Sequence, residues 1–149
     1  EPATGEVQVR TIDGLSPVGI CGSGMIDLVA QLYLAGMIDI RGKYVPEKCG
    51  ERIQTIDAMQ HLIVVFSKDS GTGEALTLSQ AEIDALMRSK AAMHTILTTM
   101  IRMIHLEWKN FRKFYVAGTF GSYINPRSAI VLGMLPDLPL EVYEALGNT

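Results

Sequence analysis

Residues 115–125 read YVAGTFGSYIN, and in this stretch an apolar strand end runs into a glycine-rich turn. Gly118 and Gly121 frame the turn, and glycine lets bare backbone approach a ligand because it has no Cβ. In α/β folds, ligands bind beyond the carboxyl ends of the strands. The stretch therefore predicts an α/β fold in which this turn, with Thr119 and Phe120 inside it, lies against a flat base or sugar.

A second glycine turn, Gly22-Ser23-Gly24, lies in the stretch GICGSGMIDLVAQLYLAG. Apolar residues at three- and four-residue spacing follow it and predict an amphipathic helix over residues 25–35, which Gly36 ends. A helix N-terminus leaves backbone N–H groups unpaired and carries a partial positive charge, so the turn suits an anion. Gly22 and Gly24 would allow close approach or positive φ, and the Ser23 hydroxyl could donate to a phosphate oxygen.

A purely structural interpretation of both turns stays open. In that case the glycines serve tight strand-to-helix packing, Phe120 is a core residue, and Asn125 is a plain turn residue ahead of Pro126. Neither turn matches a P-loop, because no GKS or GKT follows, and neither has the GxGxxG fingerprint of a Rossmann fold. Two glycine turns that face one ligand are a stronger signal than either turn alone.

Composition bounds the class of protein. The chain has 149 residues, 48% hydrophobic and 19% charged, which predicts one compact domain over residues 1–149. The formal net charge is −3, the pI is about 5.6, and the 13 Lys and Arg residues are scattered, so no nucleic-acid partner is expected. The 2 cysteines predict no disulfide framework and favour a reducing, cytoplasmic setting. No apolar run approaches the ~18–20 residues of a membrane span, so no membrane is expected as a partner.

The remaining elements follow from periodicity and turn residues. Val7, Val9 and the following Thr11-Ile12 indicate a short strand that ends at the turn dipeptide 13–14. Further strands are predicted at residues 52–56, 61–66 and 114–117, a polar exposed loop at residues 68–74, a partly helical run at residues 122–132 and a short helix at residues 140–146.

The strongest helix signal begins at Ser79, where Glu82 completes a capping box and Leu78 can contact Ile83. The helix is predicted over residues 80–104. Core packing is the default interpretation of its apolar stripe; the methionines would also suit a partner-binding face, and a homodimer contact through this helix is a secondary interpretation. The stripe comprises Ile83, Leu86, Met87, Met93, Ile96, Leu97, Met100, Ile101 and Ile104.

Few side chains point to chemistry of their own. Cys21 lies at a helix N-terminus, where a thiolate would be stabilised, but a buried and inert thiol is the expected state. Cys49 lies in a polar loop and receives no role. His94 and His105 are too far apart on one helix to share a metal, and Lys90 is expected to be a solvated helix lysine. We therefore expect no catalytic residue and no metal ligand in this chain.

Five separated motifs, in the expected order and over nearly the whole chain, together resemble one protein family. It is the C-terminal ATPase region of the iron–sulfur proteins that reductively activate corrinoid proteins, within the superfamily of acetate kinase, sugar kinases, heat-shock chaperones and actin. The motifs are GICGSGMIDLVAQLYLAGMID, LTLSQAEIDALMRSKAAM, FYVAGTFGSYINP, GMLPD and ALGNT.

The resemblance implies a ribonuclease H-like (actin-like ATPase) half domain, a mixed sheet with flanking helices that forms one wall of an ATP cleft. In that superfamily a strand–GG–helix element touches adenosine, and residues 118–121 correspond to it, with Asn125 nearby. Thr119 replaces the second glycine of the pair, which is a departure from the pattern. A YGTG-like turn lies near the terminal phosphates in related sugar kinases, and residues 22–24 look similar to it.

The resemblance also implies a parent protein that uses ATP with Mg and a [2Fe–2S] centre to return a corrinoid protein from cob(II)amide to cob(I)amide. This chain lacks the aspartate–glycine phosphate motifs that hold magnesium, and it lacks the cysteine cluster for the [2Fe–2S] centre. It begins at Glu1-Pro2 and ends at a turn-forming run, residues 147–149, as a fragment would. The fragment is therefore expected to be inactive by itself.

Two other functions remain open from the sequence. One is a non-catalytic dimerisation or interaction module, in which the glycine turns serve packing only. The other is a phosphotransferase domain like that of a sugar kinase or acetate kinase.

Overall fold

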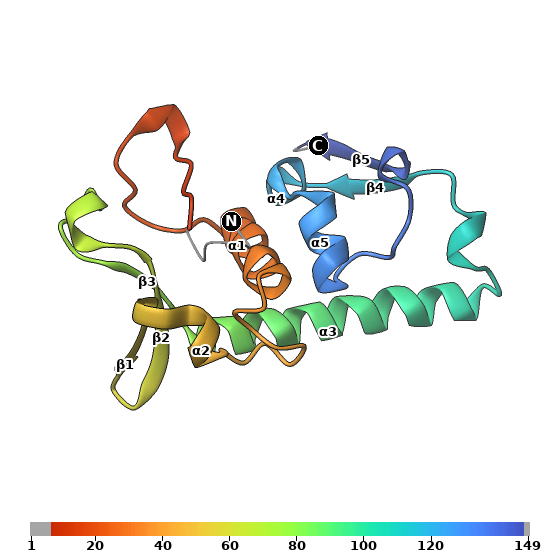
Figure 1. Ribbon diagram of the computed structural model, residues 1–149. Helices are drawn as coiled ribbons and strands as arrows, with labels where there is room; N and C mark the ends of the chain where they lie inside the picture. The colour runs from red at the N-terminus through yellow and green to blue at the C-terminus, as the bar shows by residue number, and fades with distance from the viewer. Residues whose placement is uncertain (1–6, 148–149) are drawn as a thin grey trace. The chain divides into compact units, whose positions relative to one another are not determined.

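The computed structural model describes residues 7–147, and the chain divides into two compact units (Figure 1). The first unit comprises Glu1–Cys21 and Gln31–Met87, and the second comprises Gly22–Ala30 and Arg88–Thr149. The boundaries fall inside two helices, α1 (Gly22–Leu34) and α3 (Gln80–Met103). The terminal runs that suggest a fragment, at Glu1-Pro2 and residues 148–149, lie outside the described residues.

The first unit contains an antiparallel sheet of three strands in the order β1-β2-β3. The strands are β1 (Ile53–Ile56), β2 (Met59–Val65) and β3 (Leu76–Ser79). Residues 62–65 of β2 are all buried, as their continuous apolar run predicts. The sequence gives β1 and β2 but not β3, because β3 is short and merges directly into the next helix.

The expected N-terminal strand is wrong. Residues 7–11 have no regular structure, and a 3₁₀ turn, η1 (Ile12–Gly14), follows them. Val7 and Val9 have the β-branched side chains of a strand, but a strand also needs a neighbour for its hydrogen-bond ladder. No described strand pairs with these residues.

Short helical pieces, which the sequence leaves irregular, precede β1 and connect β2 with β3. They are α2 (Pro46–Cys49) and η2 (Gly50–Arg52) before β1, and η3 (Ser67–Asp69), which overlaps the start of the expected exposed loop of residues 68–74. Pro46 suits the first turn of α2, where its missing N–H costs no hydrogen bond. An isolated bridge between Ile38 and Tyr44 closes the loop that precedes α2.

The predicted capping box at the start of α3 is confirmed. Glu82 Oε2 accepts from the Ser79 backbone N–H at 2.7 Å, and Ser79 Oγ accepts from the Glu82 backbone N–H at 3.2 Å. Leu78 and Ile83, the predicted staple, are fully buried. The helix ends at Met103, within one residue of the expectation, because His105 takes a φ of 54° and Leu106 N donates back to Ile101 O.

A polar network fixes the loop before α2 to the start of α3. The Tyr44 hydroxyl donates to Leu78 O at 2.7 Å, and burial raises its pKa. At the surface of the same region, Lys43 Nζ forms an ion pair with Asp84 Oδ1 at 2.7 Å. Cys49 is buried nearby, with its Sγ 3.4 Å from Met37 O, so its sequence context in a polar loop is misleading.

The second unit contains a parallel pair of strands, β4 (Phe114–Ala117) and β5 (Tyr143–Gly147). A 3₁₀ turn, η4 (Trp108–Asn110), leads into β4. The helices α4 (Thr119–Tyr123) and α5 (Pro126–Leu132) follow β4. The expected run of partial helix over residues 122–132 is thus two helices, with Pro126 at the first position of α5.

The expected short helix at residues 140–146 is wrong. A 3₁₀ turn, η5 (Leu140–Val142), leads into β5 instead. The Glu, Ala and Leu residues of this segment favour a helix locally, but pairing with β4 decides its structure. Tyr143 lies opposite Phe114 with ring centroids 5.4 Å apart, and burial, with the charge of Asp137 second, raises the pKa of Tyr143 to about 12.

Buried residues of the second unit come from α1, α3 and the α5 region. Ile26, Val29 and Ala129 are almost fully buried. Asn125 caps α5 and Gly133 ends it, so both boundaries of this helix follow from sequence. Among the residues that the structure describes, no helix combines the length and apolar character needed to cross a bilayer.

The turn of the β1–β2 hairpin yields a stability prediction. Asp57 and Ala58 connect the paired residues 56 and 59 with φ of 48° and 61°, the pattern of a type I′ turn, and Ala58 is exposed. Ala58→Gly should raise the free energy of unfolding by about 1 kcal/mol, because a left-handed φ is unfavourable for a residue with a Cβ. Denaturant titration measures this as a higher midpoint at constant slope.

The matched control is Ala91→Gly, an exposed position inside α3, where glycine should lower the free energy of unfolding by about 1 kcal/mol. A loss of stability in both variants would contradict the left-handed turn at Ala58.

The two cysteines yield a second prediction. Cys21 is exposed, whereas Cys49 is buried and desolvation raises the pKa of its thiol. In the native protein at about pH 8 a thiol reagent should label Cys21 within minutes and Cys49 only after unfolding, because the thiolate is the reacting form. A thiol whose pKa rises on folding stabilises the fold below its ordinary pKa, and this contribution is lost as pH rises through the folded pKa.

Cys21→Ser and Cys49→Ser assign the two labelling phases. Equal labelling rates in the native protein would show that Cys49 is open to solvent.

Candidate functional site

The turn at residues 118–121 connects the carboxyl end of β4 with α4 in the second unit, as its sequence predicts. Gly118 N donates to Gly147 O at 2.8 Å, so the turn is also tied to the end of β5. Ser122 N and Oγ both donate to Gly118 O, at 3.3 and 3.4 Å. Gly147 could not be predicted as a partner of this turn, because the link depends on the pairing of β5 with β4.

The two glycines of the turn are needed for different physical reasons. Gly118 has a φ of 94°, which a residue with a Cβ rarely adopts, and nothing lies within 4 Å of where its Cβ would be. Gly121 is helical, but a Cβ there would lie 2.7 Å from Val116 Cγ1 and 3.0 Å from Val116 O. Gly121 therefore serves packing of α4 on β4, while Gly118 leaves open space beside its backbone.

The other predicted residues of this turn have mixed outcomes. The backbone of Thr119 and Phe120 forms the start of α4, and their side chains lie outside the described part of the chain. Asn125 is exposed, and its Oδ1 accepts from Arg127 N at 3.0 Å as the cap of α5. This capping bond is the structural role that the sequence left open for Asn125.

The second predicted turn, Gly22-Ser23-Gly24, does not precede its helix but forms the first turn of α1. Neither glycine has a positive φ, so of the two alternatives, close approach or positive φ, only close approach is left for them. Because α1 begins directly at Gly22, these residues carry the N–H groups of the first turn. They belong to the same compact unit as residues 118–125.

Asp27 lies one helical turn after Ser23 in α1. Its Oδ1 is buried and has no hydrogen-bond partner among the described residues. Side chains on a helix lean toward its N-terminus, so the carboxylate lies on the side of the first turn. A buried oxygen without a partner is costly in free energy, and Thr98 Oγ1 in α3 is the other such atom among the described residues.

Cys21 differs from its predicted state, and potential metal ligands among the described residues do not cluster. Cys21, next to the first turn of α1, is exposed, so the expected buried state is wrong. Within residues 7–147, no three His, Cys, Asp or Glu side chains lie close enough together to hold a metal ion. Lys90 is half-buried, and its side chain passes beside Gly133 in the second unit.

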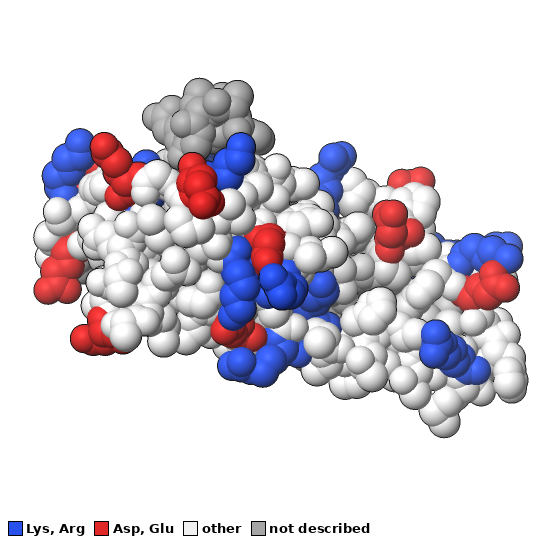
Figure 2. All heavy atoms as spheres, turned by 60° about the horizontal axis from the view of Figure 1, so that its bottom comes forward, with Lys and Arg blue, Asp and Glu red and all other residues white. Residues whose placement is uncertain are grey.

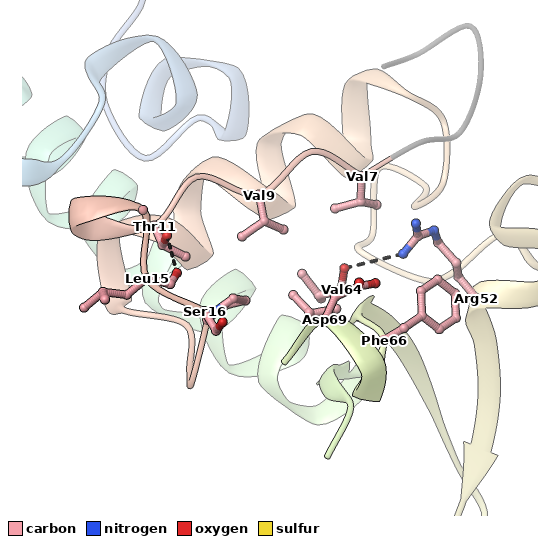
Figure 3. A pocket seen from close by; sticks show the side chains of 12 residues that line it. Val7, Val9, Thr11, Leu15, Ser16, Arg52, Val64, Phe66 and Asp69 are labelled. Carbon is pink, nitrogen blue, oxygen red and sulfur yellow. Dashed lines mark hydrogen bonds between the residues drawn. The ribbon is translucent and has the colours of Figure 1, made fainter. Parts of the chain in front are cut away.

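The first unit has a pocket that the sequence did not indicate (Figure 3). Its volume is about 370 Å³, and the N-terminal segment and the end of β2 line it, including Val7, Leu15 and Phe66. Arg52 lies 4.8 Å from the Phe66 ring centroid and donates to Ile63 O and Val64 O at 3.0 and 3.4 Å. Both bonds come from Nη1, and none of the glycine-turn residues lines this pocket.

The chain is similar in sequence or structure to two known proteins that are named as activators of corrinoid systems. The corrinoid activation enzyme RamQ of Eubacterium limosum is 24% identical over 154 residues, which cover 97% of this chain and 26% of RamQ. The solved structure of a reductive activator for corrinoid, iron-sulfur protein has 36% sequence identity and a TM-score of 0.91, over 96% of this chain and 23% of that one. The chain thus spans about a quarter of the length of these relatives.

The family model described as the C-terminal domain of RACo, the ASKHA domain, matches residues 1–149. The predicted family and the predicted actin-like fold are both confirmed, with antiparallel and parallel sheets and flanking helices. The glycine turn after β4, the glycine helix start of α1 and this match over the whole chain lead to one conclusion: the chain belongs to the family of C-terminal ASKHA domains of RACo.

Proposed function

We propose that this chain is the nucleotide-binding half of an ATP-dependent reductive activator, which returns a corrinoid protein from cob(II)amide to cob(I)amide. The observation that carries the proposal is Gly118, whose backbone at the carboxyl end of β4 has a φ of 94° and open space where a Cβ would be. Backbone in that state can lie against a flat group such as an adenosine. The relatives are named as activators of corrinoid systems, which favours this ligand and this reaction.

In this proposal the two glycine segments contact different parts of one nucleotide. Residues 118–121, with Asn125 close in sequence, would contact adenosine. Gly22, Ser23 and Gly24 would contact phosphate oxygens with the first-turn N–H groups of α1, where the helix dipole favours negative charge. Asp27, with its buried and unpartnered Oδ1, would accept from a hydroxyl or a bound water of the ligand.

Magnesium and the [2Fe–2S] centre do not fit the described residues of this chain. Mg²⁺ prefers carboxylate and water oxygens, and no cluster of suitable side chains is present within residues 7–147. The cluster needs several thiolates, whereas Cys49 is buried with a raised pKa and Cys21 is the only other cysteine of the sequence. We therefore assign neither group to this chain, and its proposed contribution is nucleotide binding by backbone N–H groups, the Ser23 hydroxyl and the Asp27 carboxylate.

The first test is nucleotide titration of the full-length protein. Gly118→Ala should weaken ATP binding about tenfold, since a methyl group would occupy the open space beside the backbone. Ser23→Ala should weaken ATP binding severalfold through loss of one hydrogen bond to phosphate. Isothermal titration calorimetry measures both affinities, and thermal unfolding in the same buffer checks that each variant is folded.

The matched control is Gly73→Ala. Gly73 has a φ of 77° with nothing within 4 Å of its Cβ position, so this variant carries a similar backbone strain in an exposed loop of the first unit. It should lose stability like Gly118→Ala but keep its ATP affinity. Unchanged ATP affinity in Gly118→Ala and Ser23→Ala would instead support an interaction module in which the glycines serve packing only.

The second test concerns the reaction. The full-length protein, mixed with its corrinoid protein and a reductant, should form cob(I)amide only when ATP is added, and the visible absorption of the corrinoid reports this directly. Product analysis should find ADP and inorganic phosphate in step with corrinoid reduction. A phosphorylated small-molecule acceptor in place of phosphate would support a sugar or acetate kinase-like phosphotransferase and overturn the proposed function.

A further inference from the structure

The second half of α3 exposes a large apolar surface. Five large apolar side chains within residues 93–104 are exposed, from 36% at Met93 to 74% at Met103. Packing in the core of this chain, their expected role, is therefore wrong for them, whereas Ile83 and Ile101 of the same helix are buried. The five residues form what we call the α3 stripe: Met93, Ile96, Met100, Met103 and Ile104.

The α3 stripe is continuous and has no polar member. At 3.6 residues per turn its five residues fall within an arc of about 100°. No other residue of the range 91–104 falls within that arc, so the charged and polar residues of this range all lie outside it. In Figure 2, which brings the underside of Figure 1 forward, most of the surface in the region of α3 is uncharged.

The helix is apolar over a wider arc than packing on one side needs. The buried Ile101 lies about 60° from the nearer edge of the stripe, so the buried and the exposed apolar faces together span about 160°. An apolar face of about 100° suffices for a helix that packs on one side. The width of the face therefore indicates a second packing partner for α3.

The sheet of the second unit also lacks neighbours. Among the described strands β4 pairs only with β5, and the two strands run parallel. Two strands alone are marginally stable, and parallel sheets normally have both faces covered. Tyr115 of β4 is nevertheless 56% exposed. The second unit thus has two incomplete surfaces, the α3 stripe and the sheet.

We propose that the α3 stripe is a permanent contact inside the complete protein, and that the rest of the longer polypeptide, outside residues 1–149, packs on it. The relatives have the length for such a contact, because this chain matches only 26% of RamQ and 23% of the solved activator. Permanent contacts are more apolar than transient ones, and the stripe consists of Met and Ile alone. This inference does not rest on the proposed function.

A transient partner fits the stripe less well. Non-obligate interfaces are about as apolar as the rest of a protein surface, and their polar groups form hydrogen bonds with the partner. The stripe offers apolar side chains only. A corrinoid protein that binds and leaves is for this reason not the occupant that we propose.

A second copy of this chain would complete only one of the two surfaces. A two-fold contact along α3 would place the stripe of one copy on the stripe of the other. It would leave β4 with β5 as its one neighbour among the described strands. The rest of the polypeptide, at about three times the length of this chain in the relatives, is long enough to cover the stripe and to extend the sheet.

Methionine oxidation in the full-length protein tests the contact. Dilute hydrogen peroxide oxidises methionines that solvent reaches, and mass spectrometry of peptides gives the rate at each one, in native and in denaturant-unfolded protein. Met100 and Met103 should oxidise about tenfold more slowly in the native protein. Met37 and Met134, each 4% exposed, give the rate of a covered methionine.

Met59 is the matched control for Met93, because the two side chains are 38% and 36% exposed. Met59 lies in β2 of the first unit and should oxidise within about threefold of its unfolded rate, while Met93 is protected. Protection of less than about threefold at both Met100 and Met103 would overturn the proposal.

A substitution measures what the contact contributes to stability. Met103→Gln keeps an unbranched, uncharged side chain that suits a helix but brings an amide into the contact, so the thermal unfolding midpoint of the full-length protein should fall by about 4 °C. Ile40→Gln is its control, because Met103 and Ile40 are 74% and 75% exposed. The control should shift the midpoint by less than about 1 °C. An unchanged midpoint in Met103→Gln would show that the stripe lies in solvent.

Dilution and partner addition identify the occupant. Protection by the same polypeptide should not change on dilution by about a hundredfold, and Met103→Gln should keep the wild-type oligomeric state. Protection that falls on dilution, or a dimer that becomes a monomer in Met103→Gln, would assign the stripe to a second copy and contradict the proposal. Protection that appears only after the corrinoid protein is added would contradict it as well.

The same samples separate this contact from the nucleotide site. Met103→Gln and Ile40→Gln should both bind ATP with wild-type affinity. A wild-type protein that binds no ATP but protects Met100 and Met103 would overturn the proposed function and support the internal contact. Normal ATP binding without that protection would do the reverse.

Discussion

The absence of a side chain at Gly121 is the constraint on which the second unit depends. A Cβ there would lie 2.7 Å from Val116 Cγ1, so any other residue would push α4 away from β4. With α4 in place, Ser122 donates to Gly118 O, and Gly118 N reaches Gly147 O at the end of β5. The bonds from Ser122 to Gly118 O therefore depend on one missing methyl group, whereas the bond from Gly118 N to Gly147 O depends on the pairing of β5 with β4.

The two glycines of this turn are needed for different reasons. Gly121 has close neighbours and serves packing, while Gly118 has none and is needed for its φ of 94°. A sequence alone gives both residues the same meaning. The surroundings of each glycine distinguish the two: Gly121 serves packing, and Gly118 is needed for its backbone conformation.

Local signals in the sequence predicted most elements of the fold. The capping box of Ser79 and Glu82, the strand before Gly118 and the helix before Gly36 each depend on neighbours a few residues away. Errors arose where distant pairing decides. Residues 143–147 have helix-favouring composition but pair with β4, and residues 7–11 look like a strand but have no partner among the described strands.

The candidate site shows the same limit at the level of side chains. The positions of residues 22–24 and 118–121 at the ends of elements were predictable, because glycine and periodicity mark those ends. Burial was not: Cys21 is exposed and Cys49 is buried, the reverse of their sequence contexts. Tyr44 and Met37, which lie near Cys49 in space, come from the loop before α2 and are themselves buried.

The two glycine segments fall in the same compact unit. Nucleotide contacts in our proposal come mainly from backbone at α1 and after β4, with the Ser23 hydroxyl and the Asp27 carboxylate as the side-chain contributions. Backbone contacts tolerate changes in side chains, and exposed side chains can change without disturbing the core. The backbone contacts of the proposed nucleotide site can therefore persist while exposed side chains elsewhere in the unit change.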